Sequence, residues 1–448
     1  MSSFPFNANA PTAFTGPLPG SCDVVVIGGG ILGVMSAWFL ARAGFRTVLC
    51  EKGRIAGEQS SRNWGWIRQQ GRDPHELPIM AEAAKIWAGL EAECGEDIGY
   101  RRSGVLYLAG SGAEMSRFEE WLPHAEAHGL DTRIVGRNEI AAMMPEAAAL
   151  WRGGLLTPSD ALAEPFLAVP ALARALQRSG VSIAENCAVR ALDMQAGRIS
   201  GVITEQGRIA CKQVVLAGGA WSALFLRRHG VSLPQLSVVA TAAATAALPP
   251  VFDGAAAESR FAFRRRQDGG YTLAPGSFHE FFLGPDALRH AHRFLPQIRS
   301  DPLGVRLRPT APRGYPDGWR TPRHWDEDAL SPFEEQRVLN PEPNRGVLGR
   351  MVERFAEVFP TLGRPGLRMA WAGMIDTLPD AVPVIDRVPQ LPGLIVATGM
   401  SGHGFGIGPG IGRVVADMAA ERPVGHDLHR FRLSRFTDGS PLELGPRL

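Results

Sequence analysis

The sequence lacks a marked excess of charge of either sign. Its 448 residues contain 47 Lys and Arg against 45 Asp and Glu, which leaves a formal net charge of +2. This balance gives no electrostatic basis for a nucleic-acid partner. The local basic run Arg264–Arg266 is too short for a polyanion site, so we interpret it as part of a solvated face.

Cysteine motifs, leader segments and long apolar runs are also lacking. The five cysteines are scattered and never form C-x-x-C, which favours free thiols in a reducing compartment. Residues 1–20 contain no Lys or Arg and no apolar core, so we expect a Pro-rich arm and not a secretory signal. No apolar run is long enough for a transmembrane helix. The cytoplasm is therefore the expected location, with peripheral membrane contact left open.

The chain shows no recognisable Ser/His/Asp triad and no set of metal ligands, so no metal site is expected. What it does have is size and apolar content. A chain of 448 residues is longer than one hydrophobic core usually organises, which predicts two domains. Its hydrophobic content of 45% argues against disorder.

The stretch from Val24 to Lys52 has the pattern of a dinucleotide-binding unit. An apolar run predicts a buried strand, Ile31–Ala43 predicts a helix, and Phe45–Glu51 predicts a second strand. Between them, Gly28 allows a tight turn, Gly30 allows close approach to a pyrophosphate, and Gly33 allows the helix to pack on the strand. Glu51, 18 residues after Gly33, is placed to accept hydrogen bonds from ribose hydroxyls and to repel a 2′-phosphate.

Two later stretches return to the same pattern of strand, glycines and helix. They are "QVVLAGGAWS" (Gln213–Ser222) and "GLIVATGMSGHGFGIGPGIG" (Gly393–Gly412). A helix beginning within Gly404–Gly412 would point its positive dipole end at a second electron-rich group, such as the N1–C2=O edge of a flavin. The first motif alone separates neither FAD from NAD nor a cofactor site from a bare structural turn.

The ordered set of motifs resembles a known superfamily. The first turn, then "GEQSSRNWG", "VVLAGGAWS", "LPDAVPVID" and "GMSGHGFGIGPG", follow one another as in the D-amino-acid oxidase/sarcosine oxidase/glycine oxidase superfamily of FAD-dependent oxidoreductases. The resemblance covers residues 23–423. It implies FAD as cofactor and oxidation of the C–N bond of an amino acid or N-alkyl amine by hydride transfer to flavin N5, giving an imine that hydrolyses.

The resemblance also implies a fold: α/β, or α+β for the whole chain. A discontinuous Rossmann-like FAD-binding domain of the glutathione-reductase type would accompany a substrate domain with a mostly antiparallel sheet. We place the FAD-binding domain at 21–75, 150–236 and 370–425, and the substrate domain at 76–149 and 237–369. Residues 1–20 form the arm, and 426–448 are expected to be an exposed C-terminal tail. Helices are expected at Leu77–Glu93 and at Glu114–Gly129, the latter interrupted at Pro123.

Expected cofactor contacts are distributed along much of the chain. The segment 57–65 should run along the pyrophosphate and flavin, Val189 should meet adenine, and residues 402–404 should meet the isoalloxazine edge. The full set is Gly28, Gly30, Ile31, Leu32, Gly33, Glu51, Lys52, Ser60, Ser61, Arg62, Asn63, Trp64, Gly65, Val189, Ala217, Gly218, Trp221, Gly373, Gly399, Ser401, Gly402, His403 and Gly404. Covalent attachment in the superfamily uses His or Cys, and 58–65 contains neither, so noncovalent FAD is expected.

Four residues are expected to serve the substrate: Arg68, Trp66, His403 and Asp376. Arg68 falls where sarcosine-oxidase-like members hold a carboxylate, and a guanidinium suits that task; a surface or phosphate-pairing arginine is the alternative, and Arg72 is a weaker choice. Trp66, with Trp64, would wall a pocket over the flavin or simply pack in the core. His403 would stabilise charge at the flavin or substrate, or be structural.

Two departures from the superfamily pattern concern the second substrate anchor. The place of a carboxylate-binding lysine after "SGHGF" is taken by Gly406, and the "GxRP" of glycine-oxidase-like chains is replaced by Ile375 and Asp376. Asp376 would favour a cationic group or pair with a pocket arginine, unless it is only a turn or cap residue. We therefore expect a larger or unusual amine, and not sarcosine or glycine.

The electron acceptor stays open between O2 and a quinone or carrier protein. The segment "FAFRRRQDGG" lacks the lysine that activates oxygen in the sarcosine-oxidase branch, which favours a dehydrogenase. Alternatives are the flavoprotein subunit of a multi-subunit amino-acid or opine-type dehydrogenase, a plain nicotinamide dehydrogenase, and a noncatalytic FAD-binding module.

Overall fold

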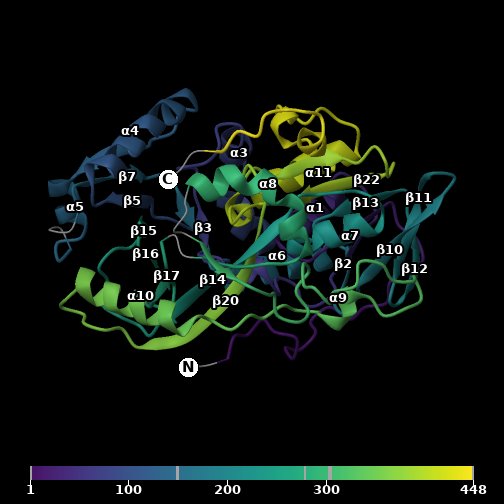
Figure 1. The fold of residues 1–448 in the computed structure, drawn as a ribbon, viewed down its shortest axis with the longest axis horizontal. Helices are drawn as coiled ribbons and strands as arrows, with labels where there is room; N and C mark the ends of the chain where they lie inside the picture. Colours follow the sequence, from purple (N-terminus) through teal and green to yellow (C-terminus); the bar gives the residue numbers. More distant parts are fainter. Residues whose placement is uncertain (1–2, 148–150, 277–278, 301–304, 446–448) are drawn as a thin grey trace.

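A computed structural model describes residues 3–147, 151–276, 279–300 and 305–445. The predicted boundary between residues 149 and 150 and the last three residues of the predicted tail lie outside these ranges. Figure 1 shows a two-lobed molecule with the nucleotide-type sheet in one lobe and the larger sheet, with α10 and α5, in the other. None of the helices in the described ranges is long and apolar enough to cross a membrane.

The first lobe is built on a six-stranded sheet that is parallel except for its edge strand β21. In order across the sheet the strands are β21 (Val384–Arg387), β22 (Leu394–Thr398), β13 (Gln213–Leu216), β1 (Val24–Ile27), β2 (Thr47–Cys50) and β9 (Ser182–Ala184). The central strands are buried on both faces, which is why they read as unbroken apolar runs.

Alternate residues of β1 enter two different cores. Val24 and Val26 pack with four helices: α1 (Ile31–Arg42), α3 (Leu77–Cys94), α6 (Pro165–Arg178) and α11 (Gly404–Ala419). Val25 packs on the other face with α7 (Ser222–Arg228) and an antiparallel sheet of β10 (Val189–Gln195), β11 (Arg198–Thr204) and β12 (Gly207–Ala210). The predicted Rossmann-like fold class is confirmed.

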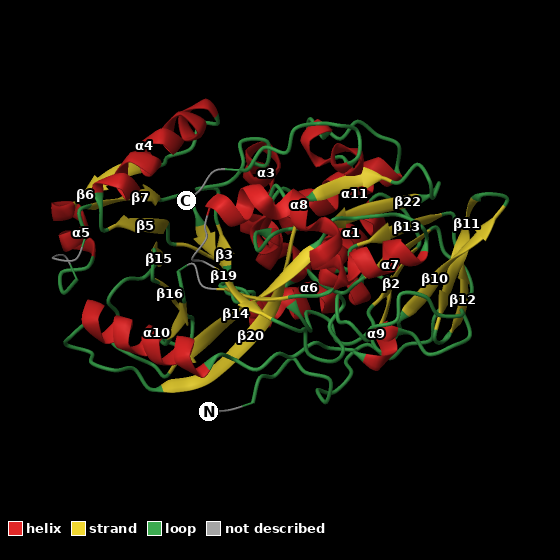
Figure 2. Ribbon diagram, in the orientation of Figure 1, coloured by secondary structure: helices red, strands yellow, loops and turns green. Residues whose placement is uncertain are grey.

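The second lobe holds a ten-stranded, mostly antiparallel sheet (Figure 2). Its path is β19 (Val305–Arg308), β18 (His279–Phe282), β14 (Leu236–Thr245), β17 (Tyr271–Ala274), β16 (Phe261–Arg265), β15 (Ala255–Glu258), β5 (Val105–Ala109), β7 (Gly153–Thr157) and β6 (Arg133–Gly136), with β20 (Leu367–Thr377) paired along β14. Parallel pairs occur only at β15–β5 and β18–β19 among its described pairings. Four helices accompany it: α4 (Gly112–Ala127), α5 (Arg137–Met143), α8 (Pro285–Ser300) and α10 (Arg345–Val358).

Several short elements complete the fold. They are α2 (Gln59–Arg62), α9 (Pro332–Glu335), the 3-10 turn η2 (Gly219–Trp221) and a small sheet of β3 (Trp66–Ile67), β8 (Ala161–Leu162) and β4 (Arg101–Arg102). The predicted domain ranges stay a prediction. Some elements pack differently from these ranges. Strand β7 and most of β20 fall in the predicted FAD-binding ranges but lie in the ten-stranded sheet. Helix α3 falls in the predicted substrate range but packs in the core with α1 and α11.

Helices α1 and α11 approach closely because glycines line the contact. A Cβ on Gly412 would lie 2.6 Å from the backbone carbon of Met35, and one on Gly410 would lie 2.5 Å from the carbonyl oxygen of Ile79 on α3. Both distances are far inside van der Waals contact, so only glycine fits. This packing fixes the N-terminus of α11 relative to the first nucleotide-type turn.

Two expectations were wrong. Helix α4 runs unbroken through Pro123, because a capping box of Ser111 and Glu114 starts it and Phe118 and Trp121 anchor its buried side. Packing of this kind outweighs the roughly 3 kcal/mol that an interior proline costs.

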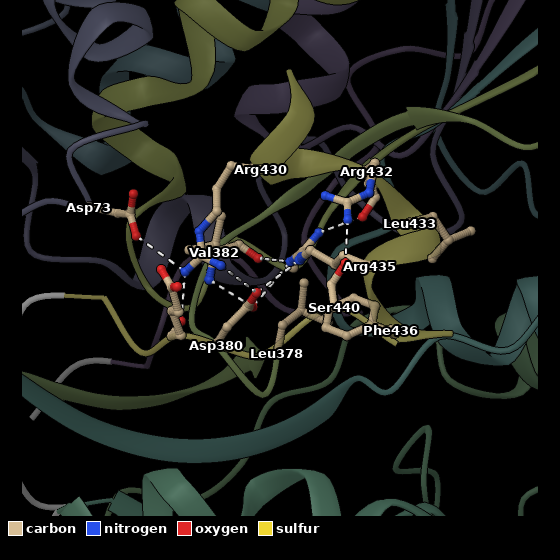
Figure 3. A network of polar contacts seen from close by, with 12 residues as sticks. Asp73, Leu378, Asp380, Val382, Arg430, Arg432, Leu433, Arg435, Phe436 and Ser440 are labelled. Carbon is tan, nitrogen blue, oxygen red and sulfur yellow. Dashed lines mark hydrogen bonds and ion pairs between the residues drawn. The ribbon is translucent and has the colours of Figure 1, made fainter. Parts of the chain in front are cut away.

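The C-terminal segment is also not an exposed tail. Phe431 and Phe436 are buried, in 3-10 turns η3 (His429–Phe431) and η4 (Leu433–Phe436), and Arg435 makes a buried two-pronged ion pair with Asp380 at 2.8 and 3.1 Å (Figure 3). Arg430 reaches Asp380 at 3.7 Å and Asp73 at 3.4 Å. The segment thereby ties together two loops that border the site described next.

Candidate active site

The first glycine turn has the shape that a dinucleotide requires. Gly28 has a φ of +109°, and a Cβ there would lie 2.4 Å from the carbonyl oxygen of Ala217 at the end of β13. A Cβ on Gly33 would lie 1.8 Å from the carbonyl oxygen of Gly28. A Cβ on Gly30 would meet no backbone atom, and its nearest neighbour would be the Ser60 hydroxyl oxygen at 3.0 Å. It would instead occupy the space in front of α1. These contacts fit a bound pyrophosphate.

Helix α1 begins directly after this turn without a side-chain cap. The Ile31 amide donates to Ser60 Oγ at 2.9 Å. The next amides, of Leu32 and Gly33, have no intrahelical acceptor by the geometry of a helix start. A phosphate placed there would be bound by N–H groups and by the helix dipole.

Glu51 ends β2 beside the turn. Its two oxygens accept from the amides of Gly29 and Gly53, each at 2.7 Å. Burial raises the pKa of Glu51, and Lys52 with the two amide bonds opposes that rise. Each oxygen keeps a second lone pair, so hydrogen bonding to a ribose stays compatible with these contacts.

The loop from 57 to 65 is fixed by its own polar groups. Asn63 donates to the carbonyl of Ser60 at 2.8 Å and accepts from the amide of Gly65 at 2.7 Å. The Ser61 hydroxyl donates to the carbonyl of Glu58 at 3.2 Å. A loop held in this way presents a defined surface to the cofactor.

Three of the residues predicted to contact the cofactor have polar groups that already form hydrogen bonds within the protein. Arg62 donates to the carbonyls of Ala372, Phe6 and Gly57 and to Asn340. Lys52 donates to Glu58 at 2.9 Å and to two carbonyls, and the Trp221 indole N–H also donates to Glu58. These side chains hold the loop in place, so their contact with FAD stays a prediction.

The C-terminal loop brings a second set of glycines to the same lobe. Gly399, Ser401 and Gly402 all have positive φ, and a Cβ on Gly399 would lie 2.2 Å from Leu378. The turn closes with the His403 amide donating to Met400 at 2.8 Å, and α11 starts at Gly404 as expected.

Other predicted contacts lie around these loops. Gly218 leads into η2, Val189 begins β10 and is buried, and Gly373 lies in β20 with its Cα against Arg62, where a Cβ would be 3.0 Å away.

Two arginines and His403 lie together beside the C-terminal loop. The Arg72 guanidinium already bonds three protein groups. It pairs with buried Glu76 at 2.9 Å and donates to the carbonyls of His403 at 3.0 Å and Arg68 at 2.8 Å. Arg68 is partly exposed, and within the described ranges its guanidinium donates only to the Gln70 carbonyl. Burial lowers the pKa of His403 well below its usual value, and Arg68 and Arg72 lower it further. The imidazole is therefore neutral beside a cation that is available to a ligand.

An aromatic wall stands next to Arg68. Its guanidinium carbon lies 5.9 Å from the Tyr107 ring centroid, Tyr107 lies 6.2 Å from Trp66, and Trp66 lies 5.3 Å from Trp64. Trp64 and Tyr107 are partly exposed, while Trp66 is buried against small residues of the large sheet, among them Ala257. Trp66 thus packs in a core and also backs the wall.

Asp376 is neither a turn nor a cap residue. It lies buried in β20, opposite Ser237 of β14. Its Oδ2 accepts from Gln235 at 2.8 Å and from the Gly399 amide at 2.9 Å. Burial raises the pKa of Asp376, and hydrogen bonds from Gln59, Gly399 and Gln235 oppose the rise. Asp376 therefore braces the C-terminal glycine loop, and it pairs with no arginine in the described part of the chain.

Sequence reasoning missed the partners that support the site. Gln59 stands inside the "GEQSS" motif but carried no distinctive signal, and Gln235 lies far from Asp376 in sequence. Tyr107 lies in β5, and no local pattern in the sequence relates it to Arg68.

The comparisons agree with this geometry. The model of the family described as FAD dependent oxidoreductase (DAO) matches residues 23–418. The chain belongs to this family. As a member, it is an FAD-dependent oxidoreductase, which confirms the cofactor and the enzyme class predicted above.

Among solved structures, L-amino acid deaminase from Proteus myxofaciens in complex with anthranilate superposes with a TM-score of 0.91 and 29% identity, covering 96% of this chain and 97% of that one. Sarcosine oxidase subunit beta from Rhizobium meliloti is 27% identical over 93% of this chain and 89% of its own length. Human mitochondrial sarcosine dehydrogenase is 24% identical over 94% of this chain, which spans only 42% of that relative.

Proposed function

We propose that this flavoprotein oxidises the C–N bond of an amino acid with a bulky apolar or aromatic side chain. The observation that carries the proposal is an available cation, Arg68, set between an aromatic wall and a neutral His403. Bound FAD supplies the chemistry by accepting a hydride at N5 from the carbon that bears the amine. The residues of the chain bind the substrate, orient it and exclude water.

Arg68 is the proposed carboxylate anchor. Its neighbour Arg72 is bound on three sides by Glu76 and two carbonyls, so it holds the loop while Arg68 meets the ligand. A guanidinium grips a carboxylate through two parallel hydrogen bonds. Because His403 stays neutral, it adds no competing positive charge at that place.

The surroundings of Gly406 disfavour a second carboxylate anchor there. A Cβ there would lie 3.2 Å from the Trp66 carbonyl oxygen and 3.3 Å from the Arg72 guanidinium. A lysine there would make tight contacts with the Trp66–Ile67 backbone, and its charge would repel Arg72. One anchor and a broad aromatic wall suit a large substrate better than glycine or sarcosine.

The relative with the high structural similarity supports the same substrate class. The Proteus myxofaciens deaminase acts on L-amino acids and was solved with anthranilate, an aromatic carboxylate. An aromatic carboxylate between Arg68 and the Trp64–Tyr107 wall would use the same two features, charge and ring contact.

The site residues named above would hold FAD without a covalent bond. The segment 58–65 offers no His or Cys, and all five cysteines are buried and free. We expect acid precipitation of the holoprotein to release the yellow colour into the supernatant. Colour that stays in the pellet would contradict noncovalent binding.

A flavin-bleaching screen tests the proposal without assuming an acceptor. Anaerobic holoprotein is mixed with aromatic, large aliphatic and small amino acids of both configurations, and with sarcosine, while the flavin absorbance is followed. We expect bleaching to be fastest with a bulky amino acid and slow with the amine that lacks its carboxylate. Fastest bleaching by glycine or sarcosine would refute the substrate class.

A second candidate is the catalytic subunit of a larger dehydrogenase. It is favoured by the relatives named sarcosine oxidase subunit beta, which this chain matches over nearly their whole length. Turnover by the isolated chain with an artificial acceptor, compared with O2, separates an independent dehydrogenase from an oxidase. Turnover that appears only after a partner chain is added would favour the subunit.

A further inference from the structure

A buried polar network lies at the edge of the six-stranded sheet where a dinucleotide is expected. Strands β1, β13 and β22 run parallel and side by side, so their carboxyl ends meet at one edge (Figure 1). In α/β sheets a dinucleotide binds outside this edge. The turns that follow the three strands include Gly28, Gly219 and Gly399, all with positive φ. Hydrogen bonds connect the second and third of these turns to the network, whose members are Gln235, Asp376, Thr398 and Ser222.

Gln235 joins the turn after β13 to Asp376. Its amide nitrogen donates to the Gly219 carbonyl at 3.1 Å and to Asp376 Oδ2 at 2.8 Å. Its amide oxygen accepts from the Ala223 amide at 3.1 Å, so the nitrogen is the end that faces the carboxylate. Asp376 Oδ2 also accepts from the Gly399 amide at 2.9 Å. One glutamine and one carboxylate oxygen thereby hold both turns in a fixed relation.

A third segment reaches the same carboxylate from α2. Gln59 lies within the loop 57–65, and a Cβ on Gly219 would lie 3.0 Å from its Nε2. Its hydrogen bond to Asp376 is one of those that oppose the rise in the pKa of that carboxyl. Three segments predicted to contact FAD are therefore connected through Asp376.

The Asp376 carboxylate is buried without a cation. The residue is 1% exposed, and it forms no ion pair with any residue that the structure describes. Other buried acids, such as Glu76 and Asp380, face arginines. Both groups on Oδ2 are N–H donors, whereas a protonated oxygen would need an acceptor there. These bonds favour the ionised form, which leaves one uncompensated negative charge beside the C-terminal glycine loop.

We propose that Asp376 is a positioning residue whose charge lowers the reduction potential of the bound flavin. The loop after β22 leads into α11, and the positive end of this helix dipole favours the reduced state, since reduction adds negative charge to the ring. A carboxylate bonded to the same loop acts in the opposite sense. A lower potential makes the flavin a weaker oxidant of the substrate and a better electron donor to the acceptor. The proposal rests on FAD as cofactor and not on the substrate class.

Replacement of Asp376 by asparagine removes the charge and keeps both bonds on Oδ2. An amide oxygen at that place still accepts from Gln235 and Gly399. Equilibration of the holoprotein with a redox dye gives the flavin potential. In Asp376→Asn the equilibrium should shift about tenfold toward reduced flavin, a rise of about 30 mV for a two-electron couple. The affinity for FAD should stay within about threefold of the parent's, because the two bonds survive.

Gln235→Met separates the bracing bonds from the charge. It removes the donor to Gly219 and Asp376, while the carboxylate stays. Titration of the apoprotein should show FAD affinity about tenfold weaker, because a hydrogen bond to a charged group is lost, and the potential should not rise. Asp286→Asn is the matched control, since Asp286 is a buried acid on α8 that pairs with Arg227, outside the network. It should change neither quantity.

Four outcomes would overturn the proposal. The first is a potential in Asp376→Asn equal to the parent's, and the second is an equal rise in Asp286→Asn. The third is an FAD affinity in Gln235→Met equal to the parent's. The fourth is an Asp376→Asn protein that folds without FAD, because the bracing bonds should survive that change and a loss of cofactor would assign Asp376 a structural role only.

Discussion

Replacement of Arg68 by methionine gives the sharpest test of the candidate site. Methionine keeps much of the length and the apolar contact with Tyr107 but removes the charge and both donors of the fork. Within the described ranges the partly exposed guanidinium has one protein acceptor, the Gln70 carbonyl, so its loss should leave the fold intact. The change therefore acts on the ligand.

The expected magnitude follows from the bonds that disappear. A hydrogen bond to a charged group contributes about 1.5–3 kcal/mol, and each 1.4 kcal/mol corresponds to tenfold. We therefore expect kcat/KM for the preferred amino acid to fall by about 10- to 150-fold. The kcat/KM of Arg68→Lys should lie between those of the parent and Arg68→Met, because lysine keeps the charge without the planar fork.

A comparison of two substrates makes this test specific. Steady-state kinetics are measured with the preferred amino acid and with the amine that lacks its carboxylate, for the parent and for Arg68→Met. Only the amino acid should lose rate. Arg102→Met, an exposed arginine on β4, serves as the control. If the amine loses as much as the amino acid, or if Arg102→Met matches Arg68→Met, the carboxylate role is refuted.

Three further predictions concern the packing and stability of the fold. Arg72→Met should lower the free energy of unfolding by about 3–5 kcal/mol, because it leaves Glu76 buried and unpaired; urea unfolding measures this, and a second change, Glu76→Leu, should recover much of it. Gly33→Ala should yield no soluble yellow protein, since its Cβ would lie 1.8 Å from the Gly28 carbonyl oxygen; a normal flavin spectrum would contradict the packing. Burial lowers the pKa of His229 to about 4, so its neutral form stabilises the fold above pH 6.5, and this contribution should be lost as the pH falls toward 4. That loss of unfolding free energy amounts to about 3 kcal/mol. In His229→Asn, urea unfolding should no longer show this loss between pH 6.5 and 4. An unchanged dependence of the unfolding free energy on pH would be evidence against the role of His229.

Local rules were enough for the first nucleotide-type turn. The identity of Gly28, Gly30 and Gly33 depends on contacts within one strand–turn–helix unit, so spacing alone predicts it. The same holds for the start of α11, where glycines precede an apolar helix. The ordered motifs then gave the family and its cofactor.

Contacts between residues far apart in the chain could not be predicted from the sequence. The bond from Gln235 to Asp376 joins residues on neighbouring elements that no local pattern relates, and Asp376 in sequence looks like any acid before a turn. The Arg435–Asp380 pair is similar, since a polar C-terminal segment gave no sign that its aromatic residues would be buried. A single chain also does not reveal that packing compensates a proline inside α4.

The glycine contact between α1 and α11 has a consequence for biosynthesis. The opening turn is synthesised long before the helix that packs against Met35 and the strand that pairs with β13, because both lie far later in the sequence. Until they arrive, the nascent first lobe has an apolar face without its partner and an incomplete sheet. Cofactor capture therefore waits for α11, and a stop codon before Gly404 would leave an apoprotein exposed to chaperones and proteases.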